Sequence, residues 1–363
     1  MRIAYRLYLM KHTALAPANI ALIKYWGKKD ESLRLPLNDS LSINIDGATT
    51  KTTIEIDEAR TEDEISFVDE QCSEKEKQKI IEHINRIFSC HCERSVYPRN
   101  KVSRAAISSI KDKSVSRHTE SRPYVKVVTQ NSFPKGTGIA SSASGFAALT
   151  VAASKAFGLN ASEKELSILS RIGSGSACRS IPDGWVQWYE GTDSASSFAQ
   201  SIAPSDWWDV RDAIIICSKT EKKVSSTAGM ESAHTSPLME RRLSEVTKRM
   251  EQMKIAIQQK DMNALGSTLE ADCLDMHAVM QSQVPPLYYW SAQTKEIMEA
   301  VKKWRNEGLQ IFFTIDAGPN VHMIYEGKDE EKVKENITKL EGIEGIIYNK
   351  IAKGTVLSPN HLF

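Results

Sequence analysis

The chain has 363 residues, of which 41% are hydrophobic and 26% charged, and its formal net charge at pH 7 is +1. This is globular composition, and the balanced charge gives no global attraction to nucleic acid or to a membrane surface. No apolar run reaches the roughly 18 residues of a membrane span, and the basic first ten residues are too short and charged for a secretory signal. We therefore expect a cytoplasmic protein of two domains, whose natural start is either Met1 or Met10.

Strands and helices alternate in the first part of the chain. A half-buried strand is predicted at 50–56 from its alternating pattern. A helix is predicted at 76–89 from an apolar face formed by Ile80, Ile81, Ile84, Ile87 and Phe88. The remaining predicted elements are a strand at 124–130, a helix after the loop at 133–144, a helix at 163–172 and a strand at 184–191 that ends the first domain.

Residues 93–121 differ from their surroundings. Seven lysines or arginines face three acidic residues there, serines are frequent and no periodicity is visible. We expect a dispensable surface excursion, with a nucleic-acid tether as the alternative.

Six cysteines are spread along the chain, which is too few and too scattered for a disulfide scaffold. The Cys-His-Cys run at 90–92, with Cys72 and His83, raises zinc as an alternative reading. The paired spacing of structural zinc sites is missing, so we expect free or locally paired thiols and no metal site.

The second part begins near 201–208, which divides the chain into domains at 1–203 and 204–363. An apolar strand at 212–218 opens it, followed by a long helix at 236–260. Leu243, Val246, Met250, Met253 and Ile257 form a helical stripe there that predicts core. The rest of the pattern is helices at 262–280 and 293–305, strands at 309–318 and 321–327, a helix at 329–340 and a strand at 345–351. This pattern predicts an α+β fold.

The octapeptide GSGSACRS at 173–180 surrounds Arg179 with small residues at what is predicted to be the start of a helix. Amides at a helix start favour negative charge, and a guanidinium suits a carboxylate or a phosphate. The sequence therefore predicts an anion site here.

The loop FPKGTGIASSAS at 133–144 has the components of a phosphate-binding loop. Gly136 and Gly138 permit tight turns, and Ser141, Ser142 and Ser144 bring hydroxyls to a helix start. It matches neither the P-loop nor the dinucleotide fingerprint. An ordinary helix cap is the alternative.

Asp316 ends an apolar run before a Gly-Pro turn, where it is either a turn residue or a buried base held by a cation. Lys24 and Lys28 follow an earlier apolar run and could supply that cation. Lysines after a strand are usually solvated, but Lys24 lies between Ile23 and Tyr25 and is the better candidate for burial.

In their order along the chain, NIALIKYWGKKD, FPKGTGIASSASGFAAL, GSGSACRS, VSSTAGM and FTIDAGPN resemble the diphosphomevalonate decarboxylase family of the GHMP kinase superfamily. The resemblance extends from about residue 16 to residue 325, and it omits the excursion. Ala140 stands where the wider superfamily has a third glycine and the decarboxylases have alanine.

This resemblance implies a two-domain α+β fold, with an N-terminal domain like domain 2 of ribosomal protein S5 and a ferredoxin-like C-terminal domain. It implies ATP and Mg²⁺, a homodimer, and no nucleic-acid or membrane partner. The implied reaction phosphorylates the 3-hydroxyl of mevalonate 5-diphosphate. Loss of phosphate and CO₂ then gives isopentenyl diphosphate.

The resemblance also assigns site residues. Asp316 is implied as the base or as the group that aligns the hydroxyl, Lys24 as its partner, and Arg179 as the holder of the substrate carboxylate. The remaining substrate contacts are implied at Tyr25, Lys28, Ser174, Ser176, Ser226 and Met230. ATP contacts are implied at Asn131, Pro134, Gly138, Ser141, Ser142 and Ser144.

Three alternatives remain. The same pocket could accept mevalonate 5-phosphate, or the reaction could stop at a 3-kinase step; Thr227 stands where some bacterial members have an arginine. The third is a non-catalytic protein that binds through the excursion.

Overall fold

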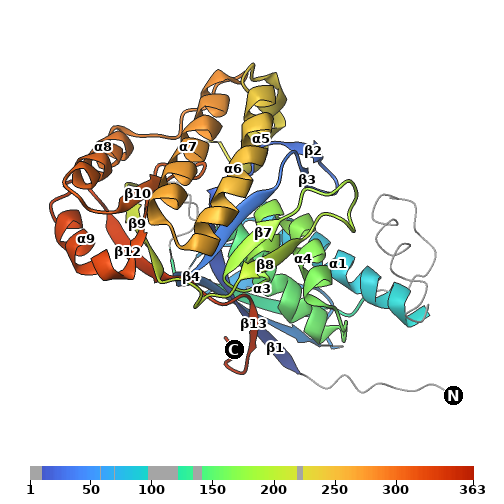
Figure 1. The fold of residues 1–363 in the computed structure, drawn as a ribbon. Coiled ribbons are helices and arrows are strands. Elements are labelled where there is room, and N and C mark those ends of the chain that lie inside the picture. The colour runs from blue at the N-terminus through green and yellow to red at the C-terminus, as the bar shows by residue number, and fades with distance from the viewer. Residues whose placement is uncertain (1–9, 58, 69, 97–121, 134–140, 219–223) are drawn as a thin grey trace.

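The computed structural model describes residues 10–57, 59–68, 70–96, 122–133, 141–218 and 224–363. Two sheets organise it, as Figure 1 shows. The larger has seven strands, in the order β13-β1-β4-β6-β5, with β7 added to β4 and β8 to β7. Its strands are β1 (Lys11–Ile23), β4 (Ser40–Ile56), β5 (Glu64–Phe67), β6 (Val125–Asn131), β7 (Trp185–Trp188), β8 (Ala199–Ala203) and β13 (Val356–Ser358). All pairs are antiparallel except β5 with β6.

Helices cover this sheet on the side away from the second sheet, seen at the right of Figure 1. They are α1 (Glu74–Val96), α3 (Ser141–Ala156), α4 (Glu163–Gly173) and the 3₁₀ helix η2 (Gly175–Ser180). The alanines of α3 allow it to pack closely on the strands, where Ala147, Ala148 and Ala152 are fully buried. A separate hairpin joins β2 (Lys28–Asp30) to β3 (Leu35–Pro36).

The second sheet has four antiparallel strands in the order β10-β11-β9-β12. Its elements in chain order are β9 (Val210–Ile216), α5 (Ser226–Glu231), η3 (Ala233–Thr235), α6 (Met239–Gln259), α7 (Met262–Ser282), α8 (Ala292–Asn306), β10 (Ile311–Thr314), β11 (Val321–Glu326), η4 (Gly327–Asp329), α9 (Glu330–Ile337) and β12 (Gly345–Lys350). This is the strand order of a ferredoxin-like unit. The predicted α+β fold is therefore confirmed.

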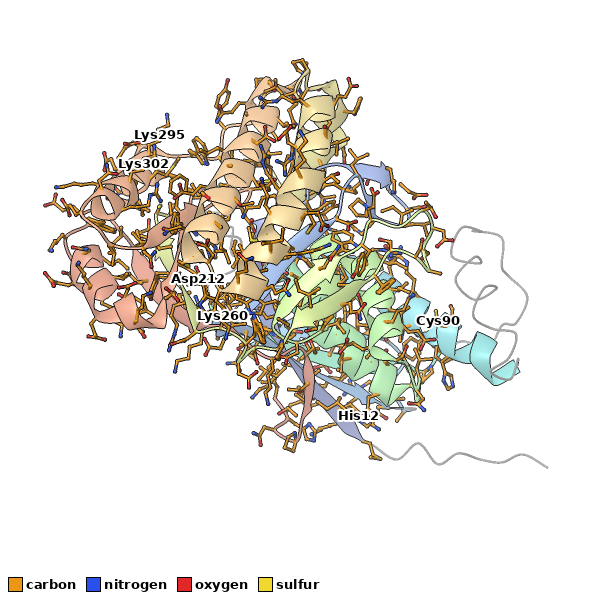
Figure 2. The ribbon with its side chains drawn as sticks, viewed as in Figure 1. His12, Cys90, Asp212, Lys260, Lys295 and Lys302 are labelled. Atoms are coloured by element: carbon orange, nitrogen blue, oxygen red, sulfur yellow. The ribbon has the colours of Figure 1, made fainter. Side chains whose placement is uncertain are left out.

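The two parts meet through strand β1. Its first half packs against α3, whereas Ile20 and Leu22 lie in a core with Met253 of α6 and Leu269 of α7. Asn349 adds a polar link, since its amide donates to Asp212 of β9 and its Oδ1 accepts the Gly47 N–H at 2.9 Å. Figure 2 labels Asp212 near this junction, with Lys295 and Lys302 on the outer side of α8. The end of β1 thus emerges between the two parts of the protein.

Most predicted elements are present, but β5 and α5 were not predicted and other elements differ from our expectation. The strand at 184–191 does not end the first sheet, because β8 follows β7 and pairs with it. Strand β13, which we did not predict, pairs with β1 near the end of the chain. Helix α1 continues to Val96, so residues 93–96 are helical rather than part of an aperiodic excursion. Residues 97–121 lie outside the described part, and the domain boundary at 203/204 stays a prediction.

No helix among the described residues is long and apolar enough to cross a membrane.

Candidate active site

Lys24 is the first residue beyond β1, where the chain leaves the sheet. After Trp26 the chain turns at Gly27, whose φ of +95° favours glycine and whose added Cβ would lie 2.6 Å from Leu37. The Lys24 side chain lies in the interior, where the residue is 1% exposed. The predicted burial of Lys24 is confirmed.

Lys24 pairs with Asp316, which follows the end of β10. Lys24 Nζ donates to Asp316 Oδ1 at 2.6 Å, and the aspartate side chain is 27% exposed to solvent. Burial would raise the pKa of Asp316, but the charge and hydrogen bond of Lys24, with smaller help from His322 and Arg179, hold that pKa below its usual value. The carboxylate is therefore ionised at neutral pH and faces a partly open site.

Arg179 lies in the last turn of η2 and is 4% exposed. Its Nε donates to Asn19 Oδ1 at 3.2 Å and its Nη1 to Ser40 Oγ at 2.8 Å. Burial lowers the pKa of Arg179, whereas Cys178 and then Asp316 oppose that shift. Because both partners are neutral side chains, the guanidinium keeps its charge and donors for an anion.

The small residues around Arg179 differ from our expectation. They form a six-residue 3₁₀ helix rather than the start of an α-helix, with Arg179 at its end. A Cβ on Gly175 would lie 3.1 Å from the Tyr25 ring and 3.3 Å from Trp188. The glycine thus makes room for protein side chains, and the predicted anion site depends on the arginine rather than on amides at a helix start.

Ser174 and Ser142 bring the predicted substrate and ATP residues together. Their hydroxyl oxygens are 3.2 Å apart, which joins the octapeptide to the first turn of α3. Ser141 begins that helix, and the Ser176 carbonyl accepts a hydrogen bond from Asn19. Ser144 is fully buried and shares a hydrogen bond with Thr50, which also donates to Asn131. Among the predicted ATP residues, Pro134 and Gly138 lie outside the described part of the chain, as do Gly136 and Ala140.

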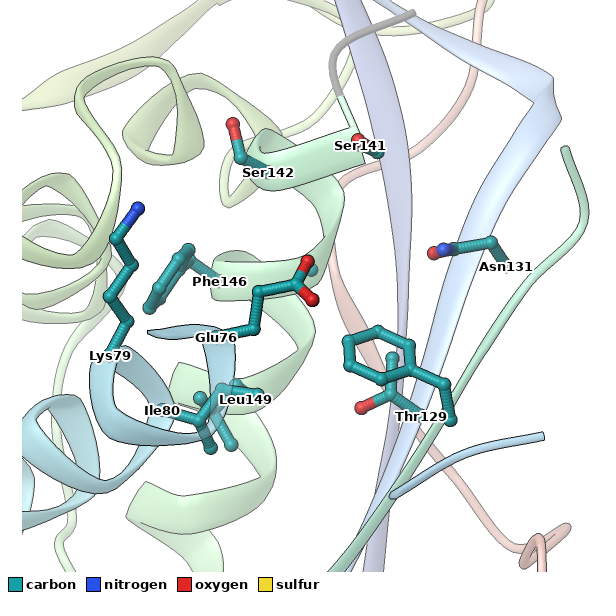
Figure 3. A pocket seen from close by; sticks show the side chains of 11 residues that line it. Glu76, Lys79, Ile80, Thr129, Asn131, Ser141, Ser142, Phe146 and Leu149 are labelled. Atoms are coloured by element: carbon teal, nitrogen blue, oxygen red, sulfur yellow. The ribbon is translucent and has the colours of Figure 1, made fainter. Parts of the chain in front are cut away.

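A pocket of about 160 Å³ opens beside the start of α3. Figure 3 shows Ser141 and Ser142 at one end, Asn131 across from them, and Glu76 and Lys79 of α1 on a third side. The apolar lining consists of Phe67, Ile80, Phe146 and Leu149. An apolar slot that leads to a helix N-terminus suits a flat ring attached to an anionic chain.

The other predicted substrate residues lie along the same junction. Tyr25 contacts Trp188 edge-on with ring centroids 4.7 Å apart, and burial raises its pKa. Ser226 and Met230 lie on α5, where Met230 packs against the cluster that contains Trp26 and Ala317. The ammonium of Lys28 pairs with Glu31 Oε2 at 2.5 Å.

Sequence reasoning missed Asn19, Ser40 and Thr50, which lie within β1 and β4. Buried polar residues in apolar strands were the only signal for them. It also missed Glu76 and Lys79, which look like an ordinary solvated helix face.

His83, considered for zinc, is buried with Nε2 2.8 Å from Thr150 Oγ1. In the described part of the chain, no group of three potential ligands could hold a metal ion.

Two family models match this chain. Residues 16–199 match the diphosphomevalonate decarboxylase-like N-terminal domain, and residues 213–355 match the mevalonate 5-diphosphate decarboxylase C-terminal domain.

Individual relatives agree with these models. Diphosphomevalonate decarboxylase of Debaryomyces hansenii is 34% identical over 94% of this chain and 83% of its own length, and that of Danio rerio is 36% identical over 87% and 76%. A solved mevalonate diphosphate decarboxylase from Staphylococcus aureus has a TM-score of 0.83 at 32% identity, covering 97% of this chain and 98% of that one. A structure described as MDDEF with MVAPP, AMPPCP and magnesium has a TM-score of 0.82 at 36% identity, covering 97% and 99%.

Proposed function

The chain belongs to the diphosphomevalonate decarboxylase family, and from this premise we propose how its residues carry out the family's reaction. The enzyme converts mevalonate 5-diphosphate and ATP into isopentenyl diphosphate, ADP, phosphate and CO₂. The Lys24–Asp316 pair carries the proposal, because an ionised carboxylate at the junction between the two parts lies within electrostatic reach of Arg179.

The first step is phosphoryl transfer to the tertiary 3-hydroxyl. Asp316 accepts a hydrogen bond from this hydroxyl, aligns its oxygen and takes its proton as the new O–P bond forms and the bond from the γ-phosphorus to ADP breaks. Lys24 keeps the carboxylate ionised and fixed in direction. Because a tertiary hydroxyl is a very weak acid, alignment contributes much of the effect.

The second step breaks two bonds. The C3–O bond breaks, and phosphate leaves with its electron pair. The bond to the carboxylate carbon also breaks, and its electrons form the new C=C bond as CO₂ departs. Arg179 holds the carboxylate through donors that Asn19 and Ser40 do not use. This orients the breaking C–C bond opposite the leaving phosphate.

The described residues fit ATP with magnesium. The apolar pocket beside α3 suits the base, and the hydroxyls of Ser141 and Ser142 lie where the phosphates would meet the helix N-terminus. Magnesium would neutralise phosphate charge and would be held largely by phosphates and water. A solved relative was determined in complex with MVAPP, AMPPCP and magnesium. This supports ATP and magnesium as the ligands of this chain.

The test incubates purified protein with ATP, Mg²⁺ and either mevalonate 5-diphosphate or mevalonate 5-phosphate, and follows ADP and CO₂. We expect both products in equal amounts from the diphosphate. ADP without CO₂ would make the protein a 3-kinase, and preference for the monophosphate would change the substrate. The proposal includes a cytoplasmic location and a homodimer, and light scattering of the purified protein tests the latter.

A further inference from the structure

The backbone of Lys24 has an unusual environment. The residue lies beyond the end of β1, so its N–H and C=O groups have no strand partner, yet it is almost completely buried. Buried backbone groups must find partners, and here side chains supply them. The N–H donates to Asp272 Oδ2 of α7 at 2.7 Å, while the carbonyl accepts from Arg242 Nη2 of α6 at 3.2 Å and from Asn38 at 3.0 Å.

Asp272 and Arg242 are themselves an ion pair, and both are 0% exposed. Arg242 Nη1 lies 3.2 Å from Asp272 Oδ1, and its Nη2 lies 3.3 Å from Asp272 Oδ2. A buried carboxylate and guanidinium that hold each other in this way have little freedom to move. They therefore hold the Lys24 peptide groups in one position.

The same helix also holds the other member of the pair. One residue further along α7, Cys273 Sγ accepts the Ile315 N–H at 3.2 Å. His277 Nε2 lies 3.3 Å from the Ile315 carbonyl. Burial lowers the pKa of His277 to about 3, so the ring is neutral and its Nε2–H can donate to that carbonyl. Ile315 directly precedes Asp316.

We infer that α7 is the common support of the Lys24–Asp316 pair, with Asp272 positioning Lys24 and with Cys273 and His277 positioning Asp316. Lys24 comes from the first sheet and Asp316 from the second, and the contact between them spans 292 positions of sequence. One rigid helix that holds the backbone next to both side chains fixes their separation. The pair then forms without depending on a flexible connection between the two parts.

Asp275 provides a matched control. It lies one turn beyond Asp272 on α7 and pairs with the two arginines that Asp272 also contacts, Arg242 at 3.3 Å and Arg249 at 2.8 Å, and in addition with Arg241 at 2.7 Å. The structure gives it no contact with Lys24 among the described residues. Removing either aspartate's charge leaves the other to pair with the arginines. Only loss of Asp272 disturbs Lys24.

The experiment compares Asp272→Asn with Asp275→Asn in the full-length protein. The measured quantity is the pKa of Asp316, obtained from a pH titration of the aspartate carboxyl signals in ¹³C NMR. The signal of Asp316 is assigned by its absence in Asp316→Asn. The groups that face this carboxylate are Lys24, Arg179, His322 and His277. In Asp272→Asn the ammonium shifts away, so the carboxylate loses its partner and its pKa should rise. In Asp275→Asn it should stay at the wild-type value.

Kinetics supply an independent measurement. The inference rests on the proposed function only here, where Asp272→Asn should lower kcat at least tenfold while KM for each substrate stays within about twofold. If Asp272→Asn does not fold, Cys273→Ala replaces it, because that change leaves the buried charges intact and should also raise the pKa of Asp316. An unchanged pKa in the folded variant, or an equal rise in Asp275→Asn, would overturn the inference. The NMR result stands whether or not the protein releases CO₂, which separates this test from that of the function.

Discussion

Lys24 Nζ and Asp316 Oδ1 lie 2.6 Å apart, although one follows the second-longest strand of the first sheet and the other follows a strand of the second sheet. The lysine is buried and the aspartate is partly open. The pair therefore presents a negative oxygen to the site with its cation behind it.

Asp316→Asn keeps the shape of this side chain and removes its charge. We expect phosphoryl transfer to fall by at least about 10²–10⁴, the range for a positioned acid–base group. Affinity for mevalonate diphosphate should change little, because the diphosphate is held elsewhere. Single-turnover release of ADP and CO₂ measures phosphoryl transfer, and calorimetry measures the affinity. Asp206→Asn, which makes the same change at an exposed position, is the control. Wild-type CO₂ release by Asp316→Asn would remove this residue from the mechanism.

Lys24→Met tests the electrostatic role of the lysine. The pKa of Asp316 is held below its usual value by Lys24 against the effect of burial. Without the ammonium, burial raises that pKa, so the acidic limb of kcat/KM should move to higher pH. The pair's stabilisation is present above the pKa of an unfolded aspartate, roughly 4, and is lost as pH falls through the lower folded value. Urea unfolding should therefore show a larger deficit for Lys24→Met at pH 7 than at pH 3. Equal deficits at both would contradict this.

Arg179→Leu removes the proposed carboxylate partner. Substrate affinity and turnover should both fall, unlike the result for Asp316→Asn. Arg179→Lys should restore little of the affinity or the turnover. An ammonium cannot donate to Asn19 and Ser40 and hold a carboxylate at the same time, as the planar guanidinium can. Steady-state kinetics and binding of mevalonate diphosphate check this. Full rescue by lysine would show that charge alone suffices.

Lys79→Ala tests the pocket beside α3. Lys79 lines that pocket, whereas Lys75 lies on the same helix α1 outside it and is exposed. If the pocket takes the nucleotide, Lys79→Ala should raise KM for ATP severalfold with KM for mevalonate diphosphate unchanged. Lys75→Ala removes the same charge and should leave both values at wild type. Equal effects would mean that only the overall charge of α1 matters.

The sequence was sufficient for elements whose pattern is local. The alanines of α3 and the apolar stripe of α6 are visible without tertiary information, and Lys24 and Asp316 stand at the ends of apolar strands. Apart from the pairing of Lys24 with Asp316, which the family resemblance implied, partners from distant segments were not predictable. Asn19 and Ser40 look like isolated polar residues within strands, and the three residues of β13 are too short for a pattern. Asp272 looks like one more acidic residue of a helix, because its contact with Lys24 exists only after the two sheets meet.

Gly266 tests how tightly α7 packs on the second sheet. A Cβ added to Gly266 would overlap the ring of Phe312, which follows Ile311 in β10. Since both the helix and the strand are buried there, the contact can be relieved only by moving one of them. Gly266→Ala should therefore destabilise the protein by about 1–3 kcal/mol, although alanine is the better helix former. Gly145→Ala is the opposite case, because its Cβ would meet no described heavy atom within 4 Å. That variant should gain about 0.5–1 kcal/mol. Urea unfolding curves measure the change in the free energy of unfolding for each variant. A stabilised Gly266→Ala would show that α7 can shift away from β10.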